Sequence, residues 1–255
     1  MHALAVDPTL PIVLGVIFLA TLIRSAFGFG EALLAVPLLA LVIPVEVAAP
    51  LVALVSVTVA AAVVLQDWRH VHVRSASKLV ASTLLGIPLG LALLTMVAEH
   101  VVKGILAAVI LAFSSFVLLA RRPPELKDDR AAWLFGFGAG VLGGAYGMNG
   151  PPLVVFGTLR RWSPERFRAT LQGYFLPASS LGVLGYWVAG LWVPAVTRYF
   201  LLSLPVIAVA IALGRALSRR IHARTFVTLI HVGLLAIGAV LLVESLAAGR
   251  RLGAW

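Results

Sequence analysis

Ten apolar segments separated by short loops make up most of the sequence, and they constrain its fold more than any other feature. A helix that crosses a bilayer needs about 20 apolar residues, and six of the segments reach that length. The chain is 61% hydrophobic and 12% charged, whereas about a quarter of the residues in a soluble domain are charged. We therefore predict an all-α integral membrane protein. The segments span 10–27, 31–45, 47–65, 76–98, 101–120, 131–146, 150–159, 167–190, 196–214 and 222–247.

Two glycine-rich breaks, 27–37 and 146–156, interrupt this apolar pattern, and the shortest segments flank them. At the second break Asn149 or Gly150 suits the N-cap of a new helix, and Pro151 suits its first turn. Free backbone groups at such a break must face protein or a water-lined cavity, because hydrocarbon offers no hydrogen bonds. We predict that each break is the tip of a helical hairpin or the middle of a broken helix. The alternative is a plain tight turn without a ligand.

The polar linker 121–130 divides the chain into two halves, 1–120 and 131–255, with the same order of segments. With the loop 66–78 placed in the cytoplasm, 15 of the 20 Lys and Arg residues fall on cytoplasmic loops, as the positive-inside rule requires. Corresponding loops of the two halves then lie on opposite sides. We predict two inverted-topology repeats, each a short broken-helix hairpin plus three long transmembrane helices, joined by a cytoplasmic linker. This organisation is typical of secondary transporters that bind substrate near the midplane.

Both tips are predicted to point helix N-termini at the centre of the protein. A helix N-terminus carries roughly half a positive charge and unsatisfied N–H groups, so it favours anions. Glycines at the tips let a ligand approach the backbone closely. The candidate substrate-binding residues are Gly28, Phe29, Gly30 and Glu31 at the first tip, Gly147, Met148, Asn149 and Gly150 at the second, and Arg24, Arg168 and Gln172.

Arg24 lies inside an apolar segment, about one turn before Gly28. An intramembrane charge is a functional-site hypothesis by default, since insertion costs at least about 2.5–3.5 kcal/mol, and the guanidinium fork suits an oxyanion. The alternative is a purely structural pair between Arg24 and Glu31. Glu31 itself is predicted either to neutralise Arg24 or to carry a coupling proton.

Three further polar residues have open roles. Arg168 and Gln172 lie four positions apart, so they share one helix face and extend the polar path behind the second tip, unless Arg168 is only a cytoplasmic anchor. His231 lies in the middle of the last segment. It is either a coupling residue that relays a proton or a hydrogen-bonded structural residue.

Several functional classes find no support in the sequence. There are no cysteines, no nucleotide-binding loop, and no His or carboxylate cluster with the spacing of metal ligands. The net charge of +10 comes from loops that set membrane topology, so it does not indicate nucleic acid. The N-terminus lacks the positive region of a cleaved signal peptide. We expect no enzyme activity, no cofactor and no bound metal.

The stretch from Arg24 to Pro37 resembles the first-half motif of the TauE/SafE family of sulfite exporter-like permeases. The stretch from Gly143 to Pro152 resembles its second-half partner, and 168–175 is similar to the part that follows. The resemblance covers essentially the whole chain. It implies transport of sulfur-containing anions such as sulfite, sulfonates or sulfoacetate, by a multi-pass protein of the bacterial inner membrane. Glu31 is a departure, since family members often have glycine there.

Together with the family resemblance, these observations predict a secondary transporter of a small sulfur-containing anion, by alternating access around a midplane site. Export is the expected direction, with import as the alternative. Its partners would be the anion, the lipid bilayer and a coupling proton or cation. An anion channel with the same pore is the first alternative. A non-transporting membrane protein, such as an assembly factor, is the second.

Overall fold

The structure, a computed structural model, describes residues 8–27, 30–67, 73–119, 125–126, 129–218 and 223–252. Within these residues the chain forms ten helices and no strands, which confirms the all-α fold class. The helices are α1 (Leu10–Phe27), α2 (Glu31–Leu39), α3 (Val45–Asp67), α4 (Val73–Met96), α5 (Glu99–Leu119), α6 (Ala132–Tyr146), α7 (Gly150–Leu159), α8 (Pro164–Val188), α9 (Pro194–Ser218) and α10 (Ala223–Leu252).

The second helix is shorter than the sequence pattern predicts. The apolar segment continues to residue 45, but α2 ends at Leu39. The chain then tightens into a turn, in which Val42 N and Ile43 N both donate to Leu39 O, at 2.9 and 2.8 Å. Pro44 follows, and a residue before proline is disfavoured in the helical conformation. The helix therefore ends within the apolar segment 31–45, because apolarity alone does not mark the end of a helix.

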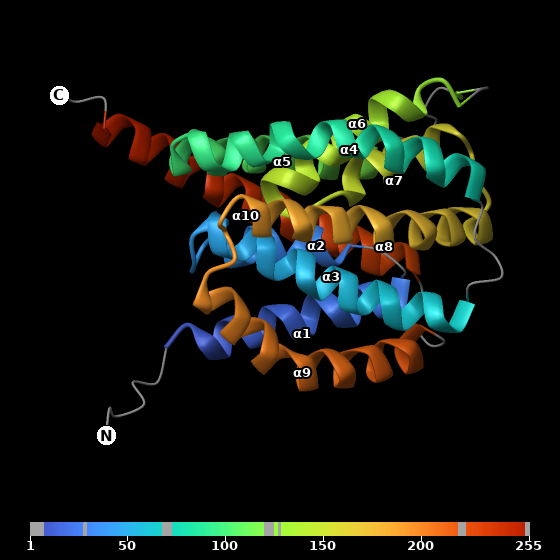
Figure 1. Ribbon diagram of the computed structural model, residues 1–255, viewed down its shortest axis with the longest axis horizontal. Coiled ribbons are helices and arrows are strands. Elements are labelled where there is room, and N and C mark those ends of the chain that lie inside the picture. Colours follow the sequence, from blue (N-terminus) through green and yellow to red (C-terminus); the bar gives the residue numbers. More distant parts are fainter. Residues whose placement is uncertain are drawn as a thin grey trace.

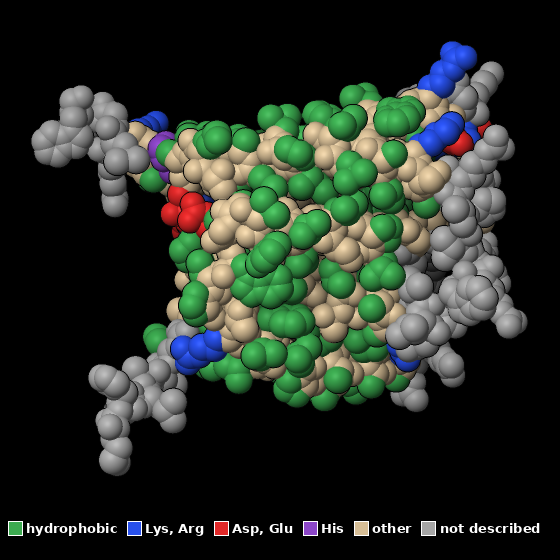
Figure 2. All heavy atoms as spheres, in the orientation of Figure 1, with side chains coloured by type: hydrophobic (Ala, Val, Ile, Leu, Met, Phe, Trp, Pro, Cys, Tyr) green, Lys and Arg blue, Asp and Glu red, His purple; other side chains and the backbone are tan. Residues whose placement is uncertain are grey.

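Five helices in the described part of the chain are long and apolar enough to cross a membrane: 45–62, 76–96, 99–119, 194–217 and 230–250. Helix α8, 25 residues long, is the sixth long helix. Figure 2 shows apolar side chains over the middle of the molecule, while charged side chains gather near its two ends. This is the surface expected of a protein whose long helices face lipid.

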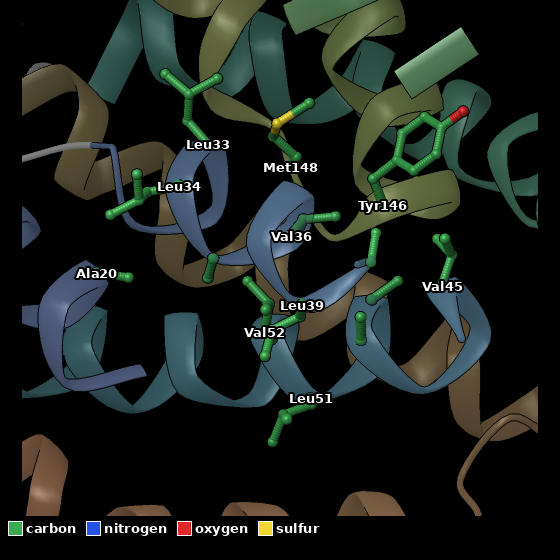
Figure 3. Packing of buried hydrophobic residues seen from close by; sticks show 14 of the residues in the cluster. Ala20, Leu33, Leu34, Val36, Leu39, Val45, Leu51, Val52, Tyr146 and Met148 are labelled. Atoms are coloured by element: carbon green, nitrogen blue, oxygen red, sulfur yellow. The ribbon is translucent and has the colours of Figure 1, made fainter. Parts of the chain in front are cut away.

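The long helices lie side by side along one direction, and α1 begins at the same end of the molecule where α10 finishes (Figure 1). Helix α4 packs along α6, α5 along α10, α1 along α9, and α3 along α8. Short helix α2 lies inside this bundle, and seven of its nine residues are buried. In Figure 3, Val36 of α2 lies between Val52 of α3 and the second break at Tyr146 and Met148. The two halves of the sequence therefore share one hydrophobic core.

The contact between α4 and α6 depends on glycines at four-residue spacing. Gly86 and Gly90 on α4 face Gly140 and Gly144 on α6, and Gly136, one turn earlier on α6, packs against Leu79 and Ser82. A Cβ at Gly140 would lie 2.3 Å from Thr83 O, and one at Gly90 would lie 2.2 Å from Val141 O. Small residues at such spacing let two membrane helices approach to backbone contact. This contact fixes α6, whose last residue leads into the second break.

Candidate functional site

A small cavity lies where the two glycine-rich breaks meet. Its volume, counted as the space open to the centre of a water molecule, is about 20 Å³. Residues from both halves of the chain line it: Arg24, Gly30, Glu31, Ala32, Leu33, Ser56, Phe113, Gly147, Asn149, Gly150, Pro151, Val154 and Phe175. The first turns of both short helices, α2 and α7, are thus brought to one place, as the hairpin-tip prediction requires.

The first break places the start of α2 near the middle of the bundle. Gly30 precedes the helix with φ of 100°, a left-handed conformation that glycine adopts without the strain of a side chain. Ser56, which lies beside the break, is eleven positions after Val45, the first residue of α3. At 1.5 Å per residue, Ser56 is about 17 Å along a helix about 35 Å long. Gly28 and Phe29, two predicted ligands, lie outside the described residues.

Arg24 is the buried cation of the cavity, with 3% of its surface exposed. Its Nη1 forms an ion pair with Glu31 Oε2 and donates a hydrogen bond to Ser56 Oγ at 2.6 Å. Its guanidinium carbon also lies 5.1 Å from the ring centre of Phe175, within the range of a cation–π interaction. Nε and Nη2 of Arg24, and Oε1 of Glu31, have no hydrogen-bond partner among the described residues. The pair is therefore only half satisfied, although both side chains are buried.

The second break is built from backbone and neutral side chains. Helix α6 ends at Tyr146, and Gly147 follows with φ of 65°. Asn149 precedes α7, but its side chain does not cap the helix. The amide packs against Gly143, where an added Cβ would meet Asn149 Oδ1 at 2.8 Å, and it forms a hydrogen bond with Tyr174. The predictions of a helix that starts at Gly150, with Asn149 as its N-cap residue and Pro151 in its first turn, are confirmed. The Asn149 side chain forms no capping hydrogen bond, because its amide turns toward α6 and α8.

Three buried tyrosines hold the second break in place. Tyr186 on α8 donates to Gly143 O at 2.6 Å. Tyr146 donates to Val102 O on α5 at 2.8 Å. The hydroxyl of Tyr174 lies 2.6 Å from Thr83 Oγ1 on α4. These three hydrogen bonds involve three different helices, α4, α5 and α8, and they fix the position of the second break relative to all three.

Replacing Tyr186 with phenylalanine tests this anchoring. Loss of one buried hydrogen bond is expected to lower the free energy of unfolding by about 0.5–1.5 kcal/mol, and to weaken stabilisation by any ligand held at the tip. Thermal unfolding of the purified protein, with and without ligand, measures both. Tyr199→Phe is the matched control, because its hydroxyl bonds to Thr9, 2.8 Å away, outside the cavity. Equal ligand responses in the two variants would contradict the anchoring role of Tyr186.

The other predicted site residues are placed as follows. Met148 is fully buried in the hydrophobic core and is not part of the cavity lining (Figure 3). His231 on α10 is buried behind the cavity, with its ring centre 5.7 Å from that of Phe113, which lines it. Arg168 and Gln172 belong to α8, but their side chains lie outside the described part of the structure.

The sequence does not single out six of the residues that line the cavity, among them three that reach it from long helices: Ser56, Phe113 and Phe175. Serines within apolar segments commonly join helices, and nothing in the sequence distinguishes Ser56 from the others. Phe175 ends the stretch 168–175 that carries part of the family resemblance, which was its only available signal. These residues reach the cavity through the packing of α3, α5 and α8, and this packing has no local sequence pattern.

The arrangement offers hydrogen-bond donors and positive charge without a metal centre. In the described part of the chain, no group of three or more His, Cys, Asp or Glu residues could hold a metal ion. The donors are the guanidinium of Arg24, the first turn of α2 and the N–H of Gly150 at the start of α7, since the two prolines that follow Gly150 carry no N–H. A buried cation with unpaired N–H groups beside two helix N-termini can hold a small anion.

Comparison with protein families gives a match to the family described as sulfite exporter TauE/SafE, over residues 13–241. The chain belongs to the TauE/SafE family. The resemblance inferred from the two break motifs is thereby confirmed. As a TauE/SafE protein, the chain is a multi-pass membrane transporter of the sulfite and anion exporter type, and not an enzyme. Comparisons of this TauE/SafE protein with curated proteins and with solved structures gave no match.

Proposed function

We propose that this protein is a secondary transporter that exports a small sulfur-containing anion, such as sulfite or an organosulfonate, by alternating access. The anion would bind in the cavity between the two breaks. The observation that carries the proposal is Arg24, a buried cation whose Nε and Nη2 have no partner among the described residues and which lines that cavity. A planar guanidinium presents paired donors that match the oxygens of a sulfite or sulfonate group.

The helix termini strengthen the preference for an anion. Residues of the first turn of α2 and of α7 line the same cavity as Arg24. Each helix N-terminus contributes roughly half a positive charge and free N–H groups. At the second tip α7 has no acidic side chain, and among its first three residues Gly150 alone carries an N–H, because Pro151 and Pro152 have none. An oxyanion could therefore bridge Arg24 and the start of α7.

We further propose that the halves 1–120 and 131–255 are inverted repeats, with α1–α5 equivalent to α6–α10. The helix pairing supports this. The contact of α4 with α6 has its counterpart in that of α9 with α1, while α3, α5 and α2 each contact their own equivalents, α8, α10 and α7. Ser56 and Phe175, which both contact Arg24, lie eleven positions after the first residues of α3 and α8. A twofold relation between the halves would produce these matched pairs.

The linker 121–130 is the proposed boundary between the repeats, on the cytoplasmic side of the inner membrane. Its described residues attach to the end of α7. Leu126 N donates to Leu159 O at 2.9 Å, and Arg160 donates back to Leu126 O at 2.7 Å. Arg160 also pairs with Asp129 at 3.2 Å. The second tip and the linker would therefore move together.

Loading the site requires the two tips to separate. A cavity of about 20 Å³ has room for one water molecule, which needs about 10–15 Å³ on this measure. A sulfonate has three oxygens and a substituent around sulfur and needs more space. We infer that the cavity widens toward one side of the membrane at a time. Alternating access would follow from this opening at a site shared by two repeats.

Binding can be tested with the purified protein by thermal unfolding in matched sodium salts of sulfite, sulfate, thiosulfate, sulfoacetate, methanesulfonate and chloride, and in zwitterionic taurine. A ligand at 100 times its Kd is expected to raise the free energy of unfolding by about 2.7 kcal/mol. We expect selective stabilisation by a sulfur anion. Counterflow of that anion in liposomes would then distinguish a transporter from a channel. Equal shifts with all salts would contradict the proposed site.

A further inference from the structure

Glu31 is placed where a bound anion would also lie. It is the first residue of α2 and is 2% exposed, and its Oε2 pairs with Nη1 of Arg24. Its carboxylate therefore satisfies both the cation and the positive end of its own helix. It acts as an internal anion at a site that we propose for an external one.

The charge of the cavity limits what can bind beside this pair. Arg24 and Glu31 together are neutral, so one monovalent anion would leave the buried site with a net negative charge. Two like charges in contact repel strongly in a buried site, because the effective dielectric constant there is far below that of water. The start of α7 offsets at most about half a charge, while that of α2 already faces Glu31. Proton uptake by Glu31 removes the excess and frees Nη1 of Arg24 for the anion.

The other groups packed around Glu31 do not supply a positive charge that would balance a bound anion. From α3, the cavity receives the neutral Ser56, and α7 contains no ionisable residue. From α8 it receives the ring of Phe175. The charged residues of α5 lie in its first two turns, at Glu99, His100 and Lys103. On α10, His231 is separated from the cavity by the ring of Phe113. Glu31 is thus the acid that directly contacts the cation of the site.

We propose that the protein carries one proton together with each monovalent anion, with Glu31 as the proton acceptor. This inference rests on the proposed function. In the empty site Glu31 is ionised and pairs with Arg24. In the loaded site a proton from the open aqueous side is bound to Glu31, and the anion takes its place on Arg24. Both states are neutral, so the translocation step moves no net charge.

The first test uses the wild-type protein and methanesulfonate, which stays monovalent between pH 5 and 9. Because anion and proton bind together, the affinity for methanesulfonate is expected to rise about tenfold for each unit of pH decrease, in the range where free Glu31 is ionised. In liposomes, a pH gradient should drive methanesulfonate flux, and a potassium diffusion potential set with valinomycin should not. Flux that follows the potential and ignores the pH gradient would overturn the coupling.

Glu31→Gln assigns the effect to this side chain. The amide keeps an acceptor for Arg24 but cannot exchange a proton, so methanesulfonate affinity should lose its pH dependence, and flux should become sensitive to the potential. Glu46→Gln is the matched control, because Glu46 is exposed in the first turn of α3. A pH slope retained in Glu31→Gln would refute the assignment. If the wild type neither binds nor exchanges any anion of the series at any pH, the proposed function itself fails.

Discussion

Replacing Gly140 with alanine is expected to lower the free energy of unfolding by about 1–3 kcal/mol, the range for overpacking a tight interior. The added methyl carbon would lie 2.3 Å from Thr83 O and 2.9 Å from Gly86 Cα. These are backbone atoms, which cannot rotate away as a side chain could. The two helices must therefore separate, and the contact would be lost along much of their length.

The effect should reach the proposed binding site. Thr83, on the α4 side of this contact, donates to Gly136 O at 2.9 Å and lies 2.6 Å from the Tyr174 hydroxyl. Tyr174 in turn bonds to Asn149 at the second tip. Displacement of α4 from α6 would therefore loosen the tip as well as the core. We expect the melting temperature and the anion response of Gly140→Ala to fall together.

Thermal unfolding checks this prediction. For a chain of this size, each kcal/mol of lost stability lowers the melting temperature by about 2–4 °C. Gly233→Ala is the control: it adds the same methyl group within helix α10, where nothing lies within 4 Å of the new atom. That variant should be unchanged or slightly stabilised, since alanine favours helix over glycine by about 0.5–1 kcal/mol. If the two variants melt alike, the glycine contact is not a determinant of stability.

Much of the fold could be predicted because membrane helices leave a strong local signal. The long helices begin and end within a few residues of the predicted segments, for example 101–120 against Glu99–Leu119. The partners of these helices were not predicted, because lipid-facing and buried apolar residues look alike in sequence. The spacing of Gly86 and Gly90, and of Gly136, Gly140 and Gly144, could have indicated the α4–α6 contact. That signal was overlooked.

The site was predictable in its backbone and less so in its side chains. Glycine and proline mark turns and helix ends through local conformational preferences, so the two breaks and the start of α7 could be predicted from the sequence. Arg24 was found because a charge in an apolar run is costly. Ser56 and Phe175 come from helices far along the chain and reach Arg24 only through tertiary packing. The Asn149 side chain points toward Gly143 and Tyr174 and does not form a capping hydrogen bond. This orientation also depends on neighbours that the local sequence does not specify.

Arg24→Ala is expected to cost about 3–5 kcal/mol of unfolding free energy, because breaking a buried ion pair leaves the other charge without compensation. Glu31 would keep neither its ion pair nor the Nη1 donor, in a cavity where Oε1 is already without a partner among the described residues. The variant should also lose its stabilisation by sulfur anions. On its own this result does not separate a structural pair from a binding site, since both readings predict a less stable protein.

The double variant Arg24→Met/Glu31→Leu makes that distinction. Replacing a whole buried ion pair by apolar residues of similar volume is often neutral or stabilising, so its thermal stability should return close to that of the wild type. Its response to sulfur anions should remain absent, because the guanidinium is gone, and counterflow in liposomes should stay at background. A double variant that is stable but still stabilised by the same anion would show that Arg24 is not its ligand. The site would then consist of the starts of α2 and α7, and the pair between Arg24 and Glu31 would serve only to hold the first break against α3.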